Sequence, residues 1–269
     1  MSAVLPRISV IIPVFNAAGF LKETIASVQA QSLDDWELLA AEDGSTDDSA
    51  AILAQLAAAD PRIQVLTTGG NRGAGAARNL AITMARGRYL AFLDADDLWH
   101  PDKLTLQLAA MQDTGVAFSC TAYERHDLAS GEKTVIGVPR RATRSDLLKT
   151  NTVACSTAMI DRTRFGTHQM RELRRRQDFL FWLDLLSETP EVLGLPLVLM
   201  TYRQHDRSLS SGKARAAKDT WAMYRHALGL PLLPALWYFA NYALRGLVRH
   251  KSPTLARRMG WLHGAEGAG

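Results

Sequence analysis

The first 97 residues alternate between apolar runs and helical patterns, and this alternation restricts the fold more than any other feature. The run "RISVIIPVF" (7–15) is β-branched and apolar, as expected of a strand that is buried on both faces. Similar runs cover 36–44, 62–68 and 87–97, and helical patterns lie between them near 21–28, 47–59 and 74–86. Strands that alternate with helices of about ten residues predict a parallel, Rossmann-like α/β sheet with helices on both faces.

The pattern becomes mixed after residue 97. A helix is predicted over 101–112, strands over 115–127 and 132–139, a helix over 144–150 and a strand over 153–161. A helix at 177–188 and a strand at 194–205 follow, and the chain is helical and basic from 213 onward. We therefore expect a main domain over 1–212 and a basic amphipathic helical tail over 213–269.

Charge is unevenly distributed between these two parts. The chain has a net charge of +4, but residues 212–269 carry nine Lys or Arg against two acidic residues, so the tail is +7 and the rest −3. This predicts an anionic partner surface for the tail. Cys120 and Cys155 have no metal-ligand spacing, and the N-terminus lacks the regions of a signal peptide, so we expect a cytoplasmic protein without disulfides.

Three polar clusters fall where predicted strands end: "PVFN" (13–16), "EDGSTDD" (42–48) and "DADD" (94–97). Ligands of open parallel sheets bind outside the carboxyl ends of the strands. Grouped carboxylates there suit Mg²⁺ or Mn²⁺, which also bind substrate phosphates, so a nucleotide substrate is indicated. Neither a P-loop nor a Gly-x-Gly-x-x-Gly follows the first strand, which disfavours P-loop NTPases and classical dinucleotide oxidoreductases.

The glycine-rich stretch "GGNRGAGAARN" (69–79) follows the third predicted strand. It would let a loop approach a ligand closely, with Arg78 as a phosphate or donor contact. A flexible loop at a helix start explains the stretch equally well.

Several motifs together resemble glycosyltransferase family 2, whose members have the GT-A fold. They occur in the order "SVIIPVFN", "EDGSTDDS", "NRGAGAARN", "GRYLAFLDADDLWHPDKL", "RRRQDFLFWLDLL" and "YRQHDRSLS", and span about residues 7–212. The basic helical tail is similar to that of bacterial surface-polysaccharide enzymes of the teichuronic acid and colanic acid kind.

The resemblance implies roles for the matching positions. Asp96 and Asp94 would bind Mn²⁺ or Mg²⁺, with His205 as a further candidate ligand. Glu42 stands where the family usually has Asp, which leaves the identity of the base open. The implied donor-binding residues are Pro13, Phe15, Asn16, Glu42, Asp43, Arg78, Asp94, Ala95 and Asp96.

Asp178 matches the position of the family's general base, although Gln177 replaces the Glu that often precedes it. One base without a covalent nucleophile implies a single in-line displacement that inverts the anomeric centre. An isolated Asp at this position would be read as a helix N-cap. Arg175 and Arg176 are candidates for a clamp on donor or acceptor phosphate, or belong to a solvated charge run.

The resemblance implies an inverting, metal-dependent glycosyltransferase that moves a sugar from a UDP-sugar to a lipid-linked saccharide in cell-envelope polysaccharide synthesis. Two alternatives stay open, a sugar nucleotidyltransferase and a non-catalytic scaffold that binds nucleotide or membrane. We expect a peripheral position on the inner face of the cell membrane and no nucleic-acid partner.

In the tail, Pro231, Pro234, Asn241 and Arg245 interrupt the apolar run 230–251, which argues against a membrane span. Its Tyr and Arg residues at helical spacing, beside an apolar stripe, predict an interfacial helix on anionic lipid. Packing against the domain, or a homodimer contact, is the alternative.

Overall fold

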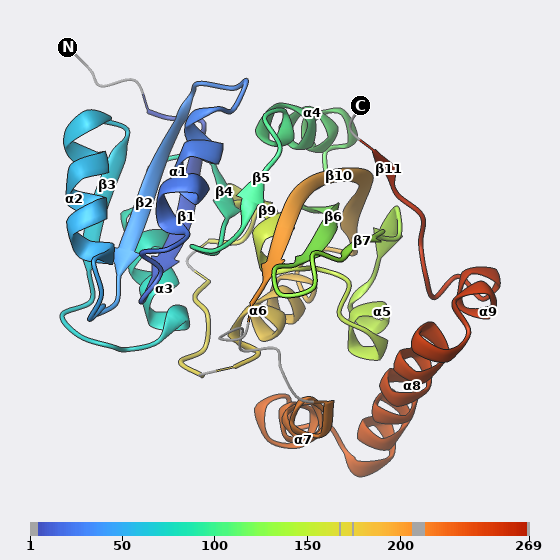
Figure 1. The fold of residues 1–269 in the computed structure, drawn as a ribbon. Coiled ribbons are helices and arrows are strands. Elements are labelled where there is room, and N and C mark those ends of the chain that lie inside the picture. Colours follow the sequence, from blue (N-terminus) through green and yellow to red (C-terminus); the bar gives the residue numbers. More distant parts are fainter. Residues whose placement is uncertain (1–4, 167, 174, 206–212, 268–269) are drawn as a thin grey trace.

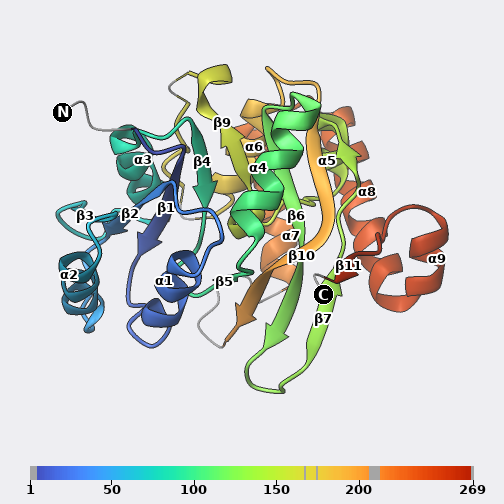
Figure 2. The same cartoon turned by 90° about the horizontal axis from the view of Figure 1, so that it is seen from above.

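A single mixed sheet runs through the protein, in the order β11-β10-β6-β9-β4-β1-β2-β3 (Figures 1 and 2). This computed structural model describes residues 5–166, 168–173, 175–205 and 213–267. The strands are β1 (Ile8–Val14), β2 (Trp36–Glu42), β3 (Ile63–Thr67), β4 (Tyr89–Phe92), β5 (Leu98–Trp99), β6 (Phe118–Asp127), β7 (Lys133–Ile136), β8 (Arg141–Ala142), β9 (Met159–Asp161), β10 (Val192–Gln204) and β11 (Glu266–Gly267). The helices are α1 (Leu21–Gln29), α2 (Ser49–Ala59), α3 (Ala74–Met84), α4 (Lys103–Thr114), α5 (Arg144–Lys149), α6 (Gln177–Leu185), α7 (Lys213–Ala222), α8 (Leu232–Lys251) and α9 (Pro253–Arg258).

The first four long strands form the predicted parallel half of the sheet. β1 pairs in parallel with β2 and β4, and β2 pairs in parallel with β3. β9 is antiparallel to its neighbours β4 and β6, whereas β10 is parallel to β6. The mostly parallel Rossmann-like sheet is therefore confirmed. Its antiparallel pairings, made by β9 and by the short strands β5, β7 and β8, lie where the predicted pattern becomes mixed.

Side chains of β1 alternate between two cores on opposite faces of the sheet. Ile8, Val10 and Ile12 pack with α1, α2 and α4, while Ile11 packs with α3, α5 and α6. Since both faces are covered by helices, β1 is apolar on both faces, and its one polar residue, Ser9, is buried with its hydroxyl donating to Glu37 at 2.7 Å.

The predicted strand over 153–161 is wrong in its first half. Cys155–Thr157 forms a 3₁₀ turn, and only Met159–Asp161 is a strand. The Thr157 hydroxyl donates to the Ala154 carbonyl at 2.6 Å, a local bond that competes with strand pairing. This turn brings Ser156 to the edge of the sheet at which the site is located.

The tail is mostly helical, as predicted, but it ends in a strand. α7 leads into a π-helical turn (Met223–Ala227), and α8 and α9 follow. The short β11 then pairs in parallel with β10, with Leu197 opposite Glu266. The tail therefore leaves the main domain and returns to the edge of its sheet (Figure 1).

Gly87, between α3 and β4, lies in close contact with the backbone of β1. A substitution at this position therefore tests how tightly the two segments pack. A Cβ at Gly87 would lie 2.6 Å from the Ser9 nitrogen and 2.7 Å from the Ile8 carbonyl carbon. Because backbone cannot yield cheaply, Gly87→Ala is expected to lower the free energy of unfolding by about 3 kcal/mol. Urea denaturation checks this, with Gly19→Ala as the control since a Cβ there meets nothing within 4 Å. Equal midpoints for the two variants would contradict the expectation.

Candidate active site

The carboxyl ends of β1, β2 and β4 lie at the same edge of the sheet, as predicted. Val14 at the end of β1 is opposite Glu42 at the end of β2, and Ile11 of β1 is opposite Phe92 at the end of β4. The clusters that follow these strands, 15–16, 43–48 and 94–97, are therefore neighbours in space.

Asn16 locks the end of β1 to the turn after β2. Its φ is +49°, a left-handed conformation that Asn tolerates better than most residues. Its Oδ1 accepts from the Thr46 N–H at 2.8 Å, and its own N–H donates to the Ser45 hydroxyl at 3.1 Å. Asn16 therefore organises this wall of the site in addition to its predicted donor contact.

Glu42, the departure from the family pattern, folds back onto its own turn. Its carboxylate accepts from the N–H groups of Gly44 at 3.1 Å and Ser45 at 2.5 Å. The Glu42 carboxylate thus caps this turn. Its predicted contact with the base or ribose would have to compete with these two hydrogen bonds.

Asp43 anchors the glycine-rich loop. It is only 2% exposed and accepts from the N–H groups of Arg72 at 2.9 Å and Gly73 at 2.7 Å. The Thr68 hydroxyl donates to it at 2.7 Å. Gly44 supports the same approach, since its φ is +75° and a Cβ there would lie 2.8 Å from the Asn71 nitrogen. Asp43 therefore positions residues 68–73, a role that the sequence analysis did not predict.

The "DADD" segment after β4 divides into an open and a buried part. Asp97 is 1% exposed and accepts from the Ser156 hydroxyl at 2.5 Å and the Arg203 N–H at 3.3 Å. Burial raises the pKa of Asp97 well above its usual value, and Asp96 and Asp94 raise it further. Ser156 also accepts from the Asp94 N–H at 3.0 Å. Asp97 and Ser156 thus hold the loop that presents Asp94 and Asp96.

Asp96 meets His205 from the end of β10. The His205 Nε2 lies 2.9 Å from the Asp96 Oδ2, and its ring stacks on Phe20 with centroids 4.8 Å apart. Burial and the nearby Asp94 raise the pKa of Asp96, while His205 lowers it. Arg203 donates to the Asp96 carbonyl and bridges to Glu23 of α1, so the end of β10 is tied to this loop.

These residues fit a divalent cation that shares its coordination with substrate. Among the described residues, no three or more His, Cys, Asp and Glu side chains are grouped so that they could hold a metal ion. Mg²⁺ and Mn²⁺ are commonly held by one or two carboxylates together with substrate phosphates and water. Asp96, His205 and Asp94 have this donor chemistry, and Asp94 and Asp96 lie close enough for Asp94 to raise the pKa of Asp96 in addition to the effect of burial.

Arg78 is buried between the acidic loop and Asp178. It is 4% exposed and forms an ion pair with Asp94. Burial lowers the pKa of Arg78, but Cys155, Asp94 and Asp178 raise it, and the net direction is upward. Its Nε and Nη1 have no hydrogen-bond partner among the described residues. A buried guanidinium with two unused nitrogens is suited to bind an anionic oxygen of a ligand.

Asp178 lies in the first turn of α6 and is not the N-cap. The N-cap position is taken by Arg176, with a φ of +64°, and no side chain caps the helix there. Burial raises the pKa of Asp178, while Arg78 lowers it. A carboxylate of raised pKa beside a buried Arg has the properties of a general base.

Gly75 allows α3 and the start of α6 to approach each other. A Cβ at Gly75 would lie 3.1 Å from the Arg171 carbonyl oxygen and 3.4 Å from the Gln177 Cγ. The glycine in "AGAAR" therefore brings Asp178 within electrostatic range of Arg78.

Comparisons with known proteins identify the family of this sequence. The model of "Glycosyl transferase family 2" matches residues 9–168, which include all three strand-end clusters. TuaG of Bacillus subtilis (strain 168), named as a teichuronic acid biosynthesis glycosyltransferase, is 42% identical over 88% of this chain and 95% of its own. The chain belongs to glycosyltransferase family 2.

Another curated relative and a solved structure match at lower identity. WfgD of Escherichia coli, a UDP-Glc:α-D-GlcNAc-diphosphoundecaprenol β-1,3-glucosyltransferase, is 30% identical over 90% of this chain and 94% of its own. The mannosyltransferase PcManGT of Pyrobaculum calidifontis, solved with GDP-Man and Mn²⁺, superposes with a TM-score of 0.64. It is 17% identical, with 96% of this chain and 79% of that chain covered. The expected GT-A fold is thus confirmed.

In this family 2 chain, the arginines before Asp178 contact the tail. Arg175 lies 3.5 Å from the Asp219 carboxylate, and the Arg176 Nη2 donates to the Thr220 hydroxyl at 3.0 Å. Both partners belong to α7. These two arginines therefore connect the tail to the turn that carries Asp178, and their predicted phosphate contacts stay a prediction. The segment 206–210 of the "YRQHDRSLS" motif lies outside the described residues.

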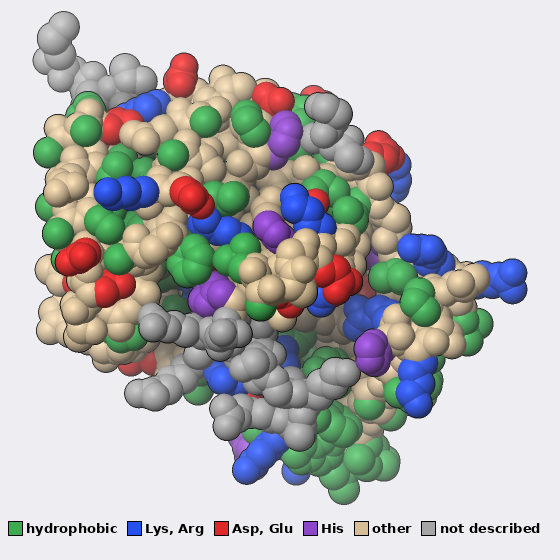
Figure 3. Space-filling view, viewed as in Figure 1, with side chains coloured by type: hydrophobic (Ala, Val, Ile, Leu, Met, Phe, Trp, Pro, Cys, Tyr) green, Lys and Arg blue, Asp and Glu red, His purple; other side chains and the backbone are tan. Residues whose placement is uncertain are grey.

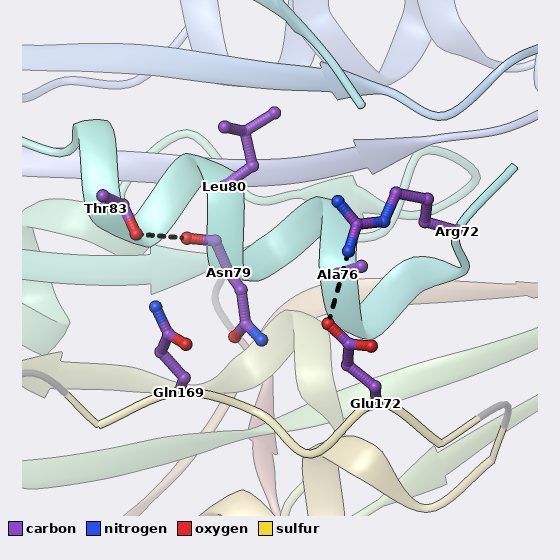
Figure 4. A pocket seen from close by; sticks show the side chains of 7 residues that line it. All are labelled: Arg72, Ala76, Asn79, Leu80, Thr83, Gln169 and Glu172. Atoms are coloured by element: carbon purple, nitrogen blue, oxygen red, sulfur yellow. Dashed lines mark hydrogen bonds and ion pairs between the residues drawn. The ribbon is translucent and has the colours of Figure 1, made fainter. Parts of the chain in front are cut away.

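A surface hollow of about 230 Å³ lies on the other side of α3 (Figure 4). Asn79 forms two hydrogen bonds of 2.7 Å with the Met170 backbone, and Arg72 lies 3.6 Å from Glu172 across the opening. None of the predicted catalytic, donor-binding or metal residues lines the hollow. The candidate site is therefore the edge formed by the strand ends.

Proposed function

We propose that this chain is an inverting glycosyltransferase that moves a sugar from a UDP-sugar to a lipid-linked saccharide of a cell-surface polysaccharide. The observation that carries the proposal is Asp178, a buried carboxylate of raised pKa that interacts electrostatically with both members of the Arg78–Asp94 ion pair. Membership of family 2 favours transfer over the nucleotidyltransferase and scaffold alternatives. The names of TuaG and WfgD support the polysaccharide, UDP and lipid-diphosphate parts of the proposal.

In the proposed reaction, an acceptor hydroxyl loses its proton to Asp178 as its oxygen bonds to C1 of the donor sugar. The bond between C1 and the diphosphate oxygen breaks, and its electron pair leaves with UDP. One attack from the opposite side inverts C1. Arg78 would keep Asp178 ionised before the reaction, because its positive charge lowers the pKa of that carboxyl.

A divalent cation bound by Asp96, with Asp94 and His205 nearby, would stabilise the negative charge of the departing diphosphate. Asn16 and residues 68–73 would form the nucleotide wall, with Pro13, Phe15, Glu42, Asp43 and Ala95 around it. A lipid-linked acceptor would require the protein to work at a membrane surface, as a peripheral protein on the inner face. In the described part of the chain, no helix is long and apolar enough to cross a membrane.

A panel of donors tests the proposal. The protein is incubated with Mn²⁺, an undecaprenyl diphosphate saccharide and, in turn, UDP-Glc, UDP-GlcNAc, UDP-Gal and GDP-Man. We expect transfer from a UDP-sugar, and NMR of the product should show the anomeric configuration opposite to that of the donor.

Each other outcome removes a defined part of the proposal. Transfer from GDP-Man alone would reject UDP, and a retained configuration would reject the single displacement. Nucleotide binding without transfer or hydrolysis of any donor would favour the scaffold. Release of diphosphate from UTP and a sugar 1-phosphate would favour the nucleotidyltransferase.

A further inference from the structure

Helix α8 packs with its polar face toward the protein. The Arg249 Nη2 donates to the Thr150 hydroxyl at 2.6 Å, and the Arg245 guanidinium lies over the Trp261 ring at 5.3 Å. Both arginines are partly buried by these contacts, and burial lowers the pKa of each. Tyr238 packs against Tyr224 on the same side, with ring centroids 6.3 Å apart. Helix α8 therefore contacts the rest of the protein through its Tyr and Arg stripe.

The opposite side of α8 is apolar and exposed. Leu233 is 78% exposed and Trp237 63%, although side chains of this kind are normally buried. With a helical repeat of 3.6 residues, they share one stripe with Leu236, Leu244 and Leu247, which are each about half exposed. We call these five residues the α8 apolar face. Figure 3 shows apolar side chains gathered at the lower right of the molecule, where α8 begins.

The tail segment that carries the α8 apolar face is basic. Between Asp219 and Glu266 the sequence contains no acidic residue. Lys251, Arg257 and Arg258 are exposed at the end of α8 and on α9. An anionic bilayer complements both the apolar residues and the positive charge.

We propose that the α8 apolar face docks into the interfacial layer of an anionic lipid bilayer, with Lys251, Arg257 and Arg258 against the headgroups. α8 would lie in the plane of the membrane, because its inner side is committed to the protein. Arg175 and Arg176 connect α7 to the turn before Asp178, so docking of the tail would hold the catalytic site at a defined height above the lipid. The proposal does not depend on the transfer reaction.

Vesicle sedimentation of the full chain, without donor or acceptor, tests the docking. Wild-type protein should sediment with vesicles of 30% phosphatidylglycerol in phosphatidylcholine. The double variant Leu233→Gln/Trp237→Gln should bind about 30-fold more weakly, because two apolar side chains no longer leave water. Met84→Gln/Leu128→Gln, which alters two exposed apolar residues elsewhere, should bind as wild type does.

The charged part of the docking surface has its own variant. The triple variant Lys251→Gln/Arg257→Gln/Arg258→Gln should lose about 100-fold in affinity for the anionic vesicles. Each basic residue near an anionic surface contributes about 1 kcal/mol of binding free energy. Thermal melting of every variant checks that it folds.

Three results would overturn the proposal. The first is undiminished sedimentation of the folded Leu233→Gln/Trp237→Gln variant. The second is equal binding of the wild type to pure phosphatidylcholine. The third is a dimer in sedimentation velocity that the same double variant abolishes, without vesicle binding by the wild type. Failure of sugar transfer with normal vesicle binding would affect only the proposed function.

Discussion

Asp178→Asn is expected to lower the rate of sugar transfer by about 10²- to 10⁴-fold, because the amide cannot take the acceptor proton. Affinity for UDP should change little, since the substitution keeps the size of the side chain and the donor residues lie on the strand ends. Initial rates measure the first effect and calorimetry of UDP binding measures the second. A kcat within about threefold of the wild type would reject Asp178 as the base.

The matched control is Asp184→Asn on the same helix. Asp184 pairs with Arg171 at the surface, at 3.2 Å, so its loss should cost little. Its rate should therefore stay close to that of the wild type. If both variants lost the transfer rate to a similar extent, the cause would be damage to α6, and the loss in Asp178→Asn would not show that Asp178 is the base.

The assignment of Asp178 as the base also predicts how kcat/KM falls at acidic pH. The base must be ionised, and its pKa is raised by burial. The rate should therefore fall as the pH drops through that raised pKa, at a higher pH than an exposed Asp would cause. Initial rates of kcat/KM against pH check this. A rate that is constant down to the usual pKa of Asp would contradict the assignment.

The second large loss of transfer activity is expected when the metal, or its main protein ligand Asp96, is removed. EDTA should abolish transfer and Mn²⁺ should restore it, because the cation contributes several kcal/mol of charge stabilisation. Asp96→Ala should lower kcat by about 10³-fold and should remove the dependence of UDP binding on Mn²⁺. Calorimetry with and without Mn²⁺ measures this dependence.

Asp113→Ala is the control for Asp96→Ala, since Asp113 is an exposed carboxylate on α4. It should keep full, Mn²⁺-dependent activity. If EDTA leaves transfer unchanged, or if Asp96→Ala binds UDP with undiminished Mn²⁺ dependence, the assignment of Asp96 to the metal is wrong.

Much of the fold could be predicted because its signals are local. The apolar runs of β1, β2 and β4 and the polar residues after them are read directly from the sequence, and parallel pairing then brings their ends together. The 3₁₀ turn at Cys155–Thr157 could not be predicted from its apolar surroundings. Its hydroxyl groups bond to Ala154, Asp94 and Asp97, and two of these partners are distant in sequence.

Several roles in the site depend on such distant partners. Asp43 is predicted as a donor contact, but its position against the glycine-rich loop requires the pairing of β2 with β3. Arg175 and Arg176 read as a phosphate clamp, yet α7 supplies partners for both. The residues around Gly75 in the sequence do not show why a glycine is needed there. The structure does, because the start of α6 lies against this position.

By itself, the sequence determined the order of strands and helices, the acidic edge of the sheet and the basic, amphipathic tail, because periodicity and charge are properties of neighbouring residues. Only the tertiary structure decided which side of α8 faces the protein. The helix has an apolar stripe and a Tyr and Arg stripe, and hydrophobicity alone would bury the first. Hydrogen bonding of Arg249 to Thr150 and stacking of Arg245 over Trp261 turn the second stripe inward, which leaves Leu233 and Trp237 exposed.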